Sequence, residues 1–337
     1  MGKRTSAAVM VVTVCAMMAS LASGMRNEAR FTPDVLEPSP VNPLLVRGRP
    51  GEFDAVKVGP RVVLKEGPTT YKMWYEGVPG PNRGSLGYAT SRDGLTWNKF
   101  AGNPVLAPSE PWEGGAQGEI SPGTVFKEGR VYKMWYHSWD GAHRRIGYAS
   151  SRDGLRWTKY FGNPVLDVGR SEAWDASQVV LPTVTRVGER YYMWYGGLGE
   201  KNDGWRIGLA TSSDGIQWKR HPGNPVLTPG PPGTWDEWGV LPGGLIWDET
   251  GFHLWYPGFK KGLVPGIGYA SSRDGLRWSR SLRNPVLSRS EAVAPDCREA
   301  GDTATAYRDG NEVRILYGGW DGRKWAICMA VSRITYK

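Results

Sequence analysis

One repeat dominates this chain of 337 residues. The tetrapeptide Asn-Pro-(Val/Leu)-Leu occurs five times, at spacings of 60 or 61 residues. Three further markers keep the same register: Ser-x-Asp-Gly-x-x-Trp, a (Met/Leu)-Trp-Tyr core that becomes Ile-Leu-Tyr in the last copy, and a Gly-Tyr-Ala string. A unit of this length buries its apolar residues against its neighbours, so the markers predict one structure made of five similar units.

Each repeat has the pattern of four short strands. Bulky β-formers surround the Trp-Tyr core and the Gly-Tyr-Ala string, Gly and Asp turns separate them, and no segment shows a helical period. Four-stranded units repeated radially are typical of propeller blades. The sequence therefore predicts an all-β fold, a five-bladed β-propeller of four-stranded blades, as a single domain over residues 25–337.

The two ends of the chain predict how the ring closes. The last repeat stops at residues 331–337, where its fourth strand should begin, and the N-terminal region holds an extra Asn-Pro-Leu-Leu at 42–45. We expect the N-terminal segment to close the last blade by supplying its missing outer strand, which would cover two free sheet edges.

The first residues predict export. Lys3 and Arg4 precede an uncharged apolar run over 7–19, and small residues follow, which is typical of a signal peptide over residues 1–24. No other stretch is apolar enough to predict a membrane span, so we expect the mature chain to be secreted or periplasmic.

Composition adds two constraints. The net charge of +9 is spread along the chain without a basic tract, which argues against nucleic-acid binding but suits an anionic ligand. Two cysteines remain after removal of the signal peptide, Cys297 and Cys328. Either they form a disulfide in an oxidising compartment or they stay as buried thiols, and their spacing does not decide between these alternatives.

The Ser-x-Asp-Gly-x-x-Trp string is interpreted as structural because it recurs. A fold needs its turn in every blade, whereas a catalytic site needs each group once. In such a turn Asp accepts backbone N–H groups, Gly takes positive φ and Trp packs between blades. Functional residues are expected where the blades differ, in the loops leading into the first strands and those joining the second and third strands. Both sets open around the central funnel.

Three acids break the repeat at the funnel end of the first strands. Glu119 precedes the first strand of blade two, and Glu299 and Asp302 lie in blade five. Carboxylates facing one another across a funnel are what acid/base cleavage of a glycosidic bond requires. We predict Glu119 as proton donor, Asp302 or Glu299 as base, and Asp54 of the leading loop of blade one as a group that tunes them. The alternative is that these acids are exposed or paired with nearby bases.

The loops joining the second and third strands combine aromatic, acidic and basic side chains. A Trp ring stacks on the C–H face of a sugar while polar groups bind its hydroxyls, so these loops predict a carbohydrate site. Their basic residues would suit an anionic glycan. The alternative is a solvated surface in which Trp braces the loops, and four scattered histidines predict no metal site. The candidate substrate-binding residues are Trp139, Asp140, His137, Arg144, Trp205, Trp320, Asp321 and, from a leading loop, Asp236.

On these motifs, residues 31–337 resemble the five-bladed propeller glycosidases of glycoside hydrolase families 43, 32/68 and 130. The resemblance implies an acid at the first-strand proline of the first blade, another beside a proline in the second, and Glu-x-Pro in a middle blade. Here the corresponding residues are Gly59-Pro60, Glu119-Ile120-Ser121-Pro122 and Leu181-Pro182, so the triad is non-standard, and only Asp302 falls at the expected height. Some relatives are implied to hold an axial calcium ion, for which this sequence offers no nameable ligand set.

Three hypotheses follow. The leading one is a glycosidase-like enzyme that acts on an extracellular polysaccharide or oligosaccharide by carboxylate acid/base chemistry in the central funnel. The alternative is a non-catalytic carbohydrate-binding propeller, which the missing triad favours. A third hypothesis, a protein-interaction scaffold, would require an exposed apolar patch, and the sequence shows no such run.

Overall fold

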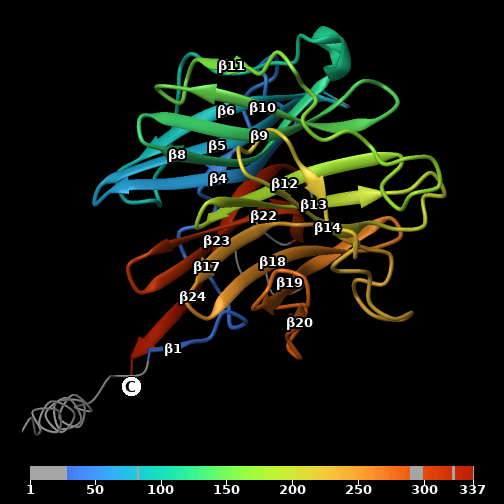
Figure 1. Ribbon diagram of the computed structural model, residues 1–337. Helices are drawn as coiled ribbons and strands as arrows, with labels where there is room; N and C mark the ends of the chain where they lie inside the picture. The colour runs from blue at the N-terminus through green and yellow to red at the C-terminus, as the bar shows by residue number, and fades with distance from the viewer. Residues whose placement is uncertain (1–28, 82, 289–298, 321–322, 337) are drawn as a thin grey trace, which may run out of the picture.

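The structure, a computed structural model, describes residues 29–81, 83–288, 299–320 and 323–336. Apart from two short 3-10 helices, η1 (Pro111–Glu113) and η2 (Gly115–Gln117), the regular structure of these residues is β-strand. The strands form twisted antiparallel blades that follow one another along the chain (Figure 1). The predicted all-β, five-bladed propeller is confirmed.

Blades one to three each contain four antiparallel strands in chain order. Single parallel pairs, Gly84 with Glu119 and Arg144 with Gln178, join neighbouring blades at the funnel end. The bounds are β4 (Lys57–Gly67), β5 (Thr70–Gly80), β6 (Arg83–Ser91) and β7 (Asn98–Lys99); β8 (Glu119–Glu128), β9 (Val131–Trp139), β10 (Arg144–Ser151) and β11 (Trp157–Lys159); and β12 (Gln178–Val187), β13 (Arg190–Leu198), β14 (Arg206–Ser212) and β15 (Lys219–Arg220).

Blade four has a first strand split in two, and blade five takes its outer strands from the N-terminal region. Strands β1, β2 and β3 all pair with β24, and Figure 1 shows β1 beside the end of β24. The predicted closure of the last blade is confirmed. The bounds are β16 (Gly239–Val240), β17 (Gly244–Asp248), β18 (Gly251–Lys260), β19 (Leu263–Ser272), β20 (Ser279–Arg280) and β21 (Leu287–Ser288); β22 (Glu299–Asp309), β23 (Glu312–Trp320) and β24 (Trp325–Tyr336); and β1 (Ala29–Phe31), β2 (Glu37–Pro38) and β3 (Leu45–Val46).

The Asn of each Asn-Pro-(Val/Leu)-Leu holds the third strand of a blade. In blade one the side chain of Asn103 accepts from the N–H of Tyr88 at 2.8 Å and donates to its carbonyl at 3.0 Å. The N-terminal copy, Asn42, makes the same pair of bonds to Met329 of β24, at 2.8 and 2.9 Å. The fifth copy of the repeat is therefore completed by residues from both ends of the chain.

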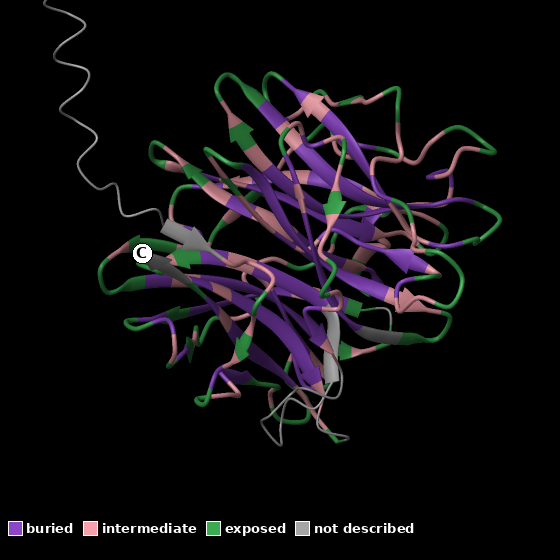
Figure 2. Ribbon diagram, turned by 90° about the horizontal axis from the view of Figure 1, so that it is seen from below, coloured by how far each residue is buried: buried purple, intermediate pink, exposed green. Residues whose placement is uncertain are grey.

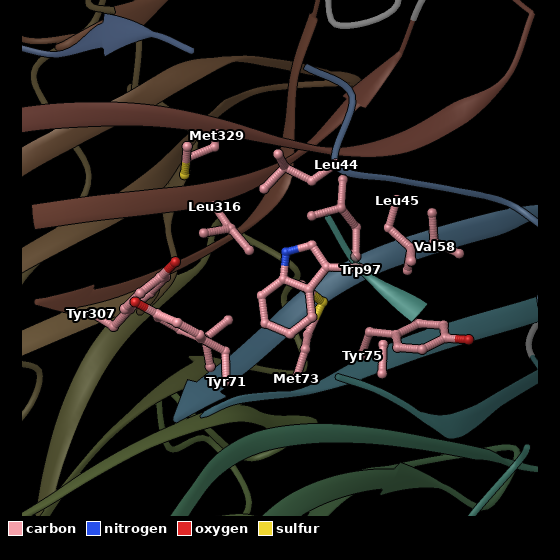
Figure 3. Packing of buried hydrophobic residues seen from close by; sticks show 13 residues of the cluster. Leu44, Leu45, Val58, Tyr71, Met73, Tyr75, Trp97, Tyr307, Leu316 and Met329 are labelled. Carbon is pink, nitrogen blue, oxygen red and sulfur yellow. The ribbon is translucent and has the colours of Figure 1, made fainter. Parts of the chain in front are cut away.

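The core lies between the blades rather than in one central mass. Purple, buried strands run through the interior in Figure 2, and exposed residues lie mainly in the turns. Figure 3 shows the cluster between blades five and one, in which Trp97 and Met73 pack against Leu316 and Met329, with Leu44 from the N-terminal segment beside them. Closing the ring thus buries apolar surface contributed by both chain ends.

Some sequence predictions concern residues outside the described ranges. The predicted signal peptide, 1–24, and Cys297 lie outside them. Cys328 is buried and disulfide-bonded, so the alternative of a free thiol is wrong for this residue. None of the described helices is long and apolar enough to cross a membrane.

Candidate functional site

A pocket of about 370 Å³ lies at the funnel end of the first strands. Blades one and two give it a charged wall, and blades three and four give it a mainly apolar wall. Such a combination suits a sugar, which has apolar C–H faces and polar edges. The lining residues are Lys57, Arg61, Glu76, Val78, Arg83, Glu119, His137 and Arg144 on the charged side, and Gln178, Val180, Leu181, Trp205, Leu241 and Phe259 on the other.

Glu119 begins β8, and both of its carboxylate oxygens have a partner. Oε2 accepts from Nη2 of Arg144 at 2.9 Å, and Oε1 lies 3.6 Å from Nε2 of His137. Burial opposes ionisation of this carboxyl group, but His137 and Arg144 outweigh burial and hold the pKa of Glu119 well below its usual range. Glu119 is therefore a carboxylate at neutral pH. The predicted role of proton donor requires a raised pKa, and this geometry does not support it.

A second carboxylate, Glu76 on β5, faces the same pocket. It is buried and forms an ion pair with Arg61, whose Nη2 lies 2.7 Å from Oε2. Gly84 separates the two acids: a Cβ placed there would lie 3.2 Å from Cγ of Glu119 and 3.5 Å from Oε1 of Glu76. The two side chains are close neighbours, each with its own arginine.

His137 connects the charged wall to blade three. Its ring is buried, and Nδ1 accepts a hydrogen bond from the backbone N–H of Leu181 at 3.3 Å. Leu181 has a φ of 51°, a left-handed conformation that costs a residue other than glycine on the order of 1–3 kcal/mol. Burial lowers the pKa of His137, so the ring is neutral at physiological pH.

The apolar wall is one small cluster. Val180, Leu181 and Leu241 are buried together, and Trp205 and Phe259 pack against them while lining the pocket. Trp205 stands in the loop between β13 and β14 and lines the pocket together with this cluster. Of the predicted sugar-binding residues, the structure brings Trp205, His137 and Arg144 into one pocket with Glu119.

The other predicted loop residues lie outside the pocket lining. Trp139 stacks on the guanidinium of Arg144, 5.6 Å from ring centroid to Cζ, and so contacts the site through that residue. Asp140 caps its own loop and pairs with Arg145. Trp320 packs on Trp325, with ring centroids 5.3 Å apart.

Asp54 and Asp236 belong to a structural brace rather than to the pocket. Asp54 is buried and accepts from the hydroxyl of Tyr75 at 3.1 Å and from Nζ of Lys99 at 2.6 Å. Asp236 pairs with the guanidinium of Arg280 at 3.4 Å in the same way. This brace recurs in four blades, because each leading-loop acid meets the second-strand Tyr and a fourth-strand base. The structure thus gives Asp54 no place beside Glu119, and Asp236 does not line the pocket. The two further braces are Glu113 with Tyr136 and Lys159, and Asp175 with Tyr195 and Arg220.

Three predicted residues cannot be placed by their side chains. Glu299 and Asp302 stand at the start of β22, but only their backbone is described, and Asp321 lies outside the described residues. Among the described residues there is no group of three or more His, Cys, Asp or Glu side chains placed to hold a metal ion.

Sequence reasoning missed Glu76 and Arg61, although a signal for both exists. The residue after the Trp-Tyr core is Glu76 in blade one and His137 in blade two, but Gly196, Pro257 and Gly318 in the others. Arg61 follows the first-strand proline, where blades two and four have Gly123 and Gly243. Glu76 thus breaks the repeat directly after the second-strand marker, and Arg61 directly after the first-strand proline.

The fold and the pocket define the class: this chain is a five-bladed propeller of the glycosidase type. Residues 121–231 match the family model of glycoside hydrolase family 130, described as β-1,4-mannooligosaccharide phosphorylase. The chain belongs to the same family as the uncharacterized protein MT1551 of Mycobacterium tuberculosis (strain CDC 1551 / Oshkosh). The two are 32% identical over 249 residues, which cover 70% of this chain and 76% of that protein.

Two further similarities extend this assignment. A 1,2-β-oligomannan phosphorylase of Thermoanaerobacter sp. (strain X514) is 28% identical over 131 residues, 36% of this chain and 43% of that enzyme. The crystal structure of a glycosyl hydrolase from Bacteroides ovatus superposes with a TM-score of 0.66 at 18% identity, over 89% of this chain and 93% of the other. The second similarity concerns the fold alone.

Proposed function

We propose that this protein cleaves glycosidic bonds of an oligosaccharide or polysaccharide in the central pocket, with phosphate or water as the acceptor. The observation that carries the proposal is the pair of arginine-held carboxylates, Glu76 and Glu119, on either side of Gly84 and opposite an apolar wall. Buried charge of this kind is costly to maintain, so its concentration at one pocket indicates a functional site.

The proposed chemistry gives each wall a task. One sugar ring lies against Trp205 and Leu241, and its hydroxyls bond to the charged wall. An acceptor oxygen attacks the anomeric carbon, the glycosidic C–O bond breaks, and the departing oxygen takes up a proton. Glu119, held as an anion, would accept the proton of an attacking water. Asp302, at the expected height in the first strand of blade five, is the proposed donor in place of Glu119.

The choice of acceptor follows from charge. Lys57 and Arg83 line the same wall as Arg61 and Arg144, so four basic side chains face the pocket. Basic side chains suit phosphate, which needs no base because it is already an anion. The phosphorylase names of the family model and of the Thermoanaerobacter relative support this choice. Water is the acceptor in the hydrolytic version of the same proposal.

A second candidate function is glycan binding without turnover. It is favoured by one specific observation: both described carboxylates of the pocket, Glu76 and Glu119, are ion-paired with an arginine. In this version the pocket would bind one sugar unit of a chain and leave its linkage intact.

We also propose, from the N-terminal sequence, that the protein acts outside the cytoplasm.

The test is a cleavage assay with the mature chain. Neutral β-linked manno-oligosaccharides and acidic oligosaccharides are each incubated with and without inorganic phosphate, and reducing ends and sugar 1-phosphate are measured. We expect cleavage, with sugar 1-phosphate formed where phosphate is the acceptor. Where water is the acceptor, Glu119→Gln removes the proposed base and should lower kcat by about 10²–10⁴-fold. Binding by calorimetry without any product would instead establish the second candidate, and full activity of Glu119→Gln would contradict the role of that carboxylate.

A further inference from the structure

A bulge in blade three carries an inference about His137. Strand β12 pairs with β13 up to Val180 opposite Gly196 and resumes at Thr183 opposite Trp194, which leaves Leu181 and Pro182 together opposite the single residue Tyr195. Leu181 is the one non-glycine residue with positive φ within the described strands. Its backbone N–H is thereby turned away from the strand ladder and toward the ring of His137 on β9.

We infer that His137 is a positioning residue for Glu119: the Leu181 bulge fixes the ring as the neutral tautomer with its hydrogen on Nε2, and that N–H helps to hold the Glu119 carboxylate toward the pocket. The consequence for catalysis rests on the proposed function. The tautomer itself does not, because it is a property of the protein without substrate.

The tautomer follows from what each partner can donate. A backbone N–H is always a donor, so Nδ1, which lies 3.3 Å from the nitrogen of Leu181, must be the acceptor. In a neutral imidazole the hydrogen then sits on Nε2, and Nε2 is the atom that faces Oε1 of Glu119 at 3.6 Å. In an imidazolium Nδ1 would also carry a hydrogen, and that N–H would point at the backbone N–H of Leu181 with no acceptor between them. The other charged groups near the ring, Arg61 and Arg144, also oppose that form.

The contacts around Glu119 show what the positioning achieves. His137 stands at one carboxylate oxygen and Arg144 at the other, 2.9 Å away. Arg144 is itself oriented, since its Nη1 donates to Oε1 of Gln178 at 2.9 Å and its guanidinium stacks on Trp139. His137 and Arg144 thus flank the carboxylate on both sides. The left-handed conformation of Leu181 directs its N–H to His137. Strained backbone conformations of this kind cluster at functional sites.

The direct test is nitrogen NMR of the histidine rings in the free protein. The chain has four histidines, so the signals of His137 can be assigned by comparing wild type with His137→Gln. We expect a protonated Nε2 and an unprotonated Nδ1 for His137 across the neutral pH range. A hydrogen on Nδ1, or an imidazolium at neutral pH, would overturn the inference whether or not the protein proves to be an enzyme.

Two variants test the consequence for turnover. His137→Gln retains a donor near the position of Nε2, whereas His137→Asn retains only an acceptor near Nδ1. We expect kcat to fall at least tenfold in His137→Asn and clearly less in His137→Gln, with KM little changed in both. His253→Gln, another buried second-strand histidine that contacts Tyr269 and Asp248 away from the pocket, is the control and should retain kcat. Equal losses in the two His137 variants would contradict positioning through Nε2. If the wild type shows no turnover, the proposed function fails and the NMR result alone decides on the tautomer.

Discussion

The indole N–H of Trp255 donates to the carbonyl oxygen of Pro33 at 3.0 Å, across 222 residues of chain. In the preceding blades the equivalent tryptophan bonds to the Gly of the next Ser-x-Asp-Gly turn; Trp194, for example, donates to Gly275 at 2.9 Å. Blade five has no such turn in its sequence. Pro33 of the N-terminal segment takes its place, so the ring closes with the same bond that joins the other blades.

This equivalence predicts equal energetic roles. Trp255→Phe and Trp194→Phe both remove a buried donor and leave a carbonyl without its partner, so each should lower the free energy of unfolding by about 1–3 kcal/mol. Urea denaturation of the two variants beside wild type measures this. If Trp255→Phe were neutral while Trp194→Phe was costly, the N-terminal segment would not contribute to closure.

The Ser-x-Asp-Gly turns predict sensitivity to acid. Oδ1 of Asp93 accepts from the N–H groups of Thr96 and Leu95, both at 2.8 Å, and these bonds lower the pKa of Asp93 to about 2 from 3.8. The pKa of the corresponding Asp153, Asp214 and Asp274 is lowered as well. A depressed native pKa stabilises the fold above the unfolded pKa, and that contribution is lost as the pH falls from about 4 to 2.

The measurement is the urea midpoint as a function of pH, for wild type and Asp93→Asn. Wild type should lose stability steeply below about pH 4. The variant should be less stable at pH 7 but lose less on acidification, so that the two curves approach each other near pH 2. Parallel curves would show that Asp93 contributes nothing to the acid sensitivity.

The fold could be predicted from the sequence because each marker performs the same task in every blade. The Asn of the tetrapeptide satisfies the backbone of a third strand, and its extra N-terminal copy, Asn42, does so for β24. A contact that recurs five times leaves a periodic trace in the sequence. The ring closure was predictable for the same reason, since an unpaired copy and a missing strand are complementary.

The site was predictable only in part, because it lies where the periodicity fails. Glu119 stands out beside a first strand, but Glu76 directly follows the second-strand marker and was not predicted as a site residue. In blade three the proline is shifted by one residue: Thr183 pairs with Trp194 as Thr124 pairs with Trp135, so alignment by the prolines is one residue out there. Backbone shifts of this kind follow from tertiary contacts rather than local sequence.

The brace and the pocket predict opposite effects for two acids. Asp54→Asn removes a charge that Lys99 and Tyr75 compensate in the interior, so it should cost about 1–3 kcal/mol of stability and leave kcat unchanged in the folded fraction. Glu119→Gln should instead impair turnover at little cost in stability. Thermal unfolding and initial rates on the same preparations check both. Loss of turnover in a stable Asp54→Asn protein would instead support the original prediction that Asp54 tunes the catalytic acids.

The apolar wall predicts the affinity for sugar. Trp205 lines the pocket beside Leu241, whereas Trp320 packs on Trp325 outside it. Trp205→Ala should weaken oligosaccharide binding about tenfold or more, which corresponds to about 1.4 kcal/mol of lost stacking. Trp320→Ala is the matched control and should bind normally. Calorimetric titration distinguishes the two variants. A larger loss of affinity in Trp320→Ala would show that the sugar binds at the loop of Trp320 and not in the pocket.

Arg61 lies between two cavities. It lines both the candidate site and a second cavity of about 360 Å³ along the first strands, which Gly123, Thr183 and Gly243 also line. Arg61→Met would keep much of the side-chain bulk but leave the buried carboxylate of Glu76 without its cation, which should cost about 3–5 kcal/mol. Adding Glu76→Gln removes the uncompensated charge, so the double variant should be more stable than Arg61→Met alone. A double-mutant cycle in urea measures the coupling. Additive effects of the two substitutions would show that Arg61 stabilises the fold by packing between the two cavities and not by balancing Glu76.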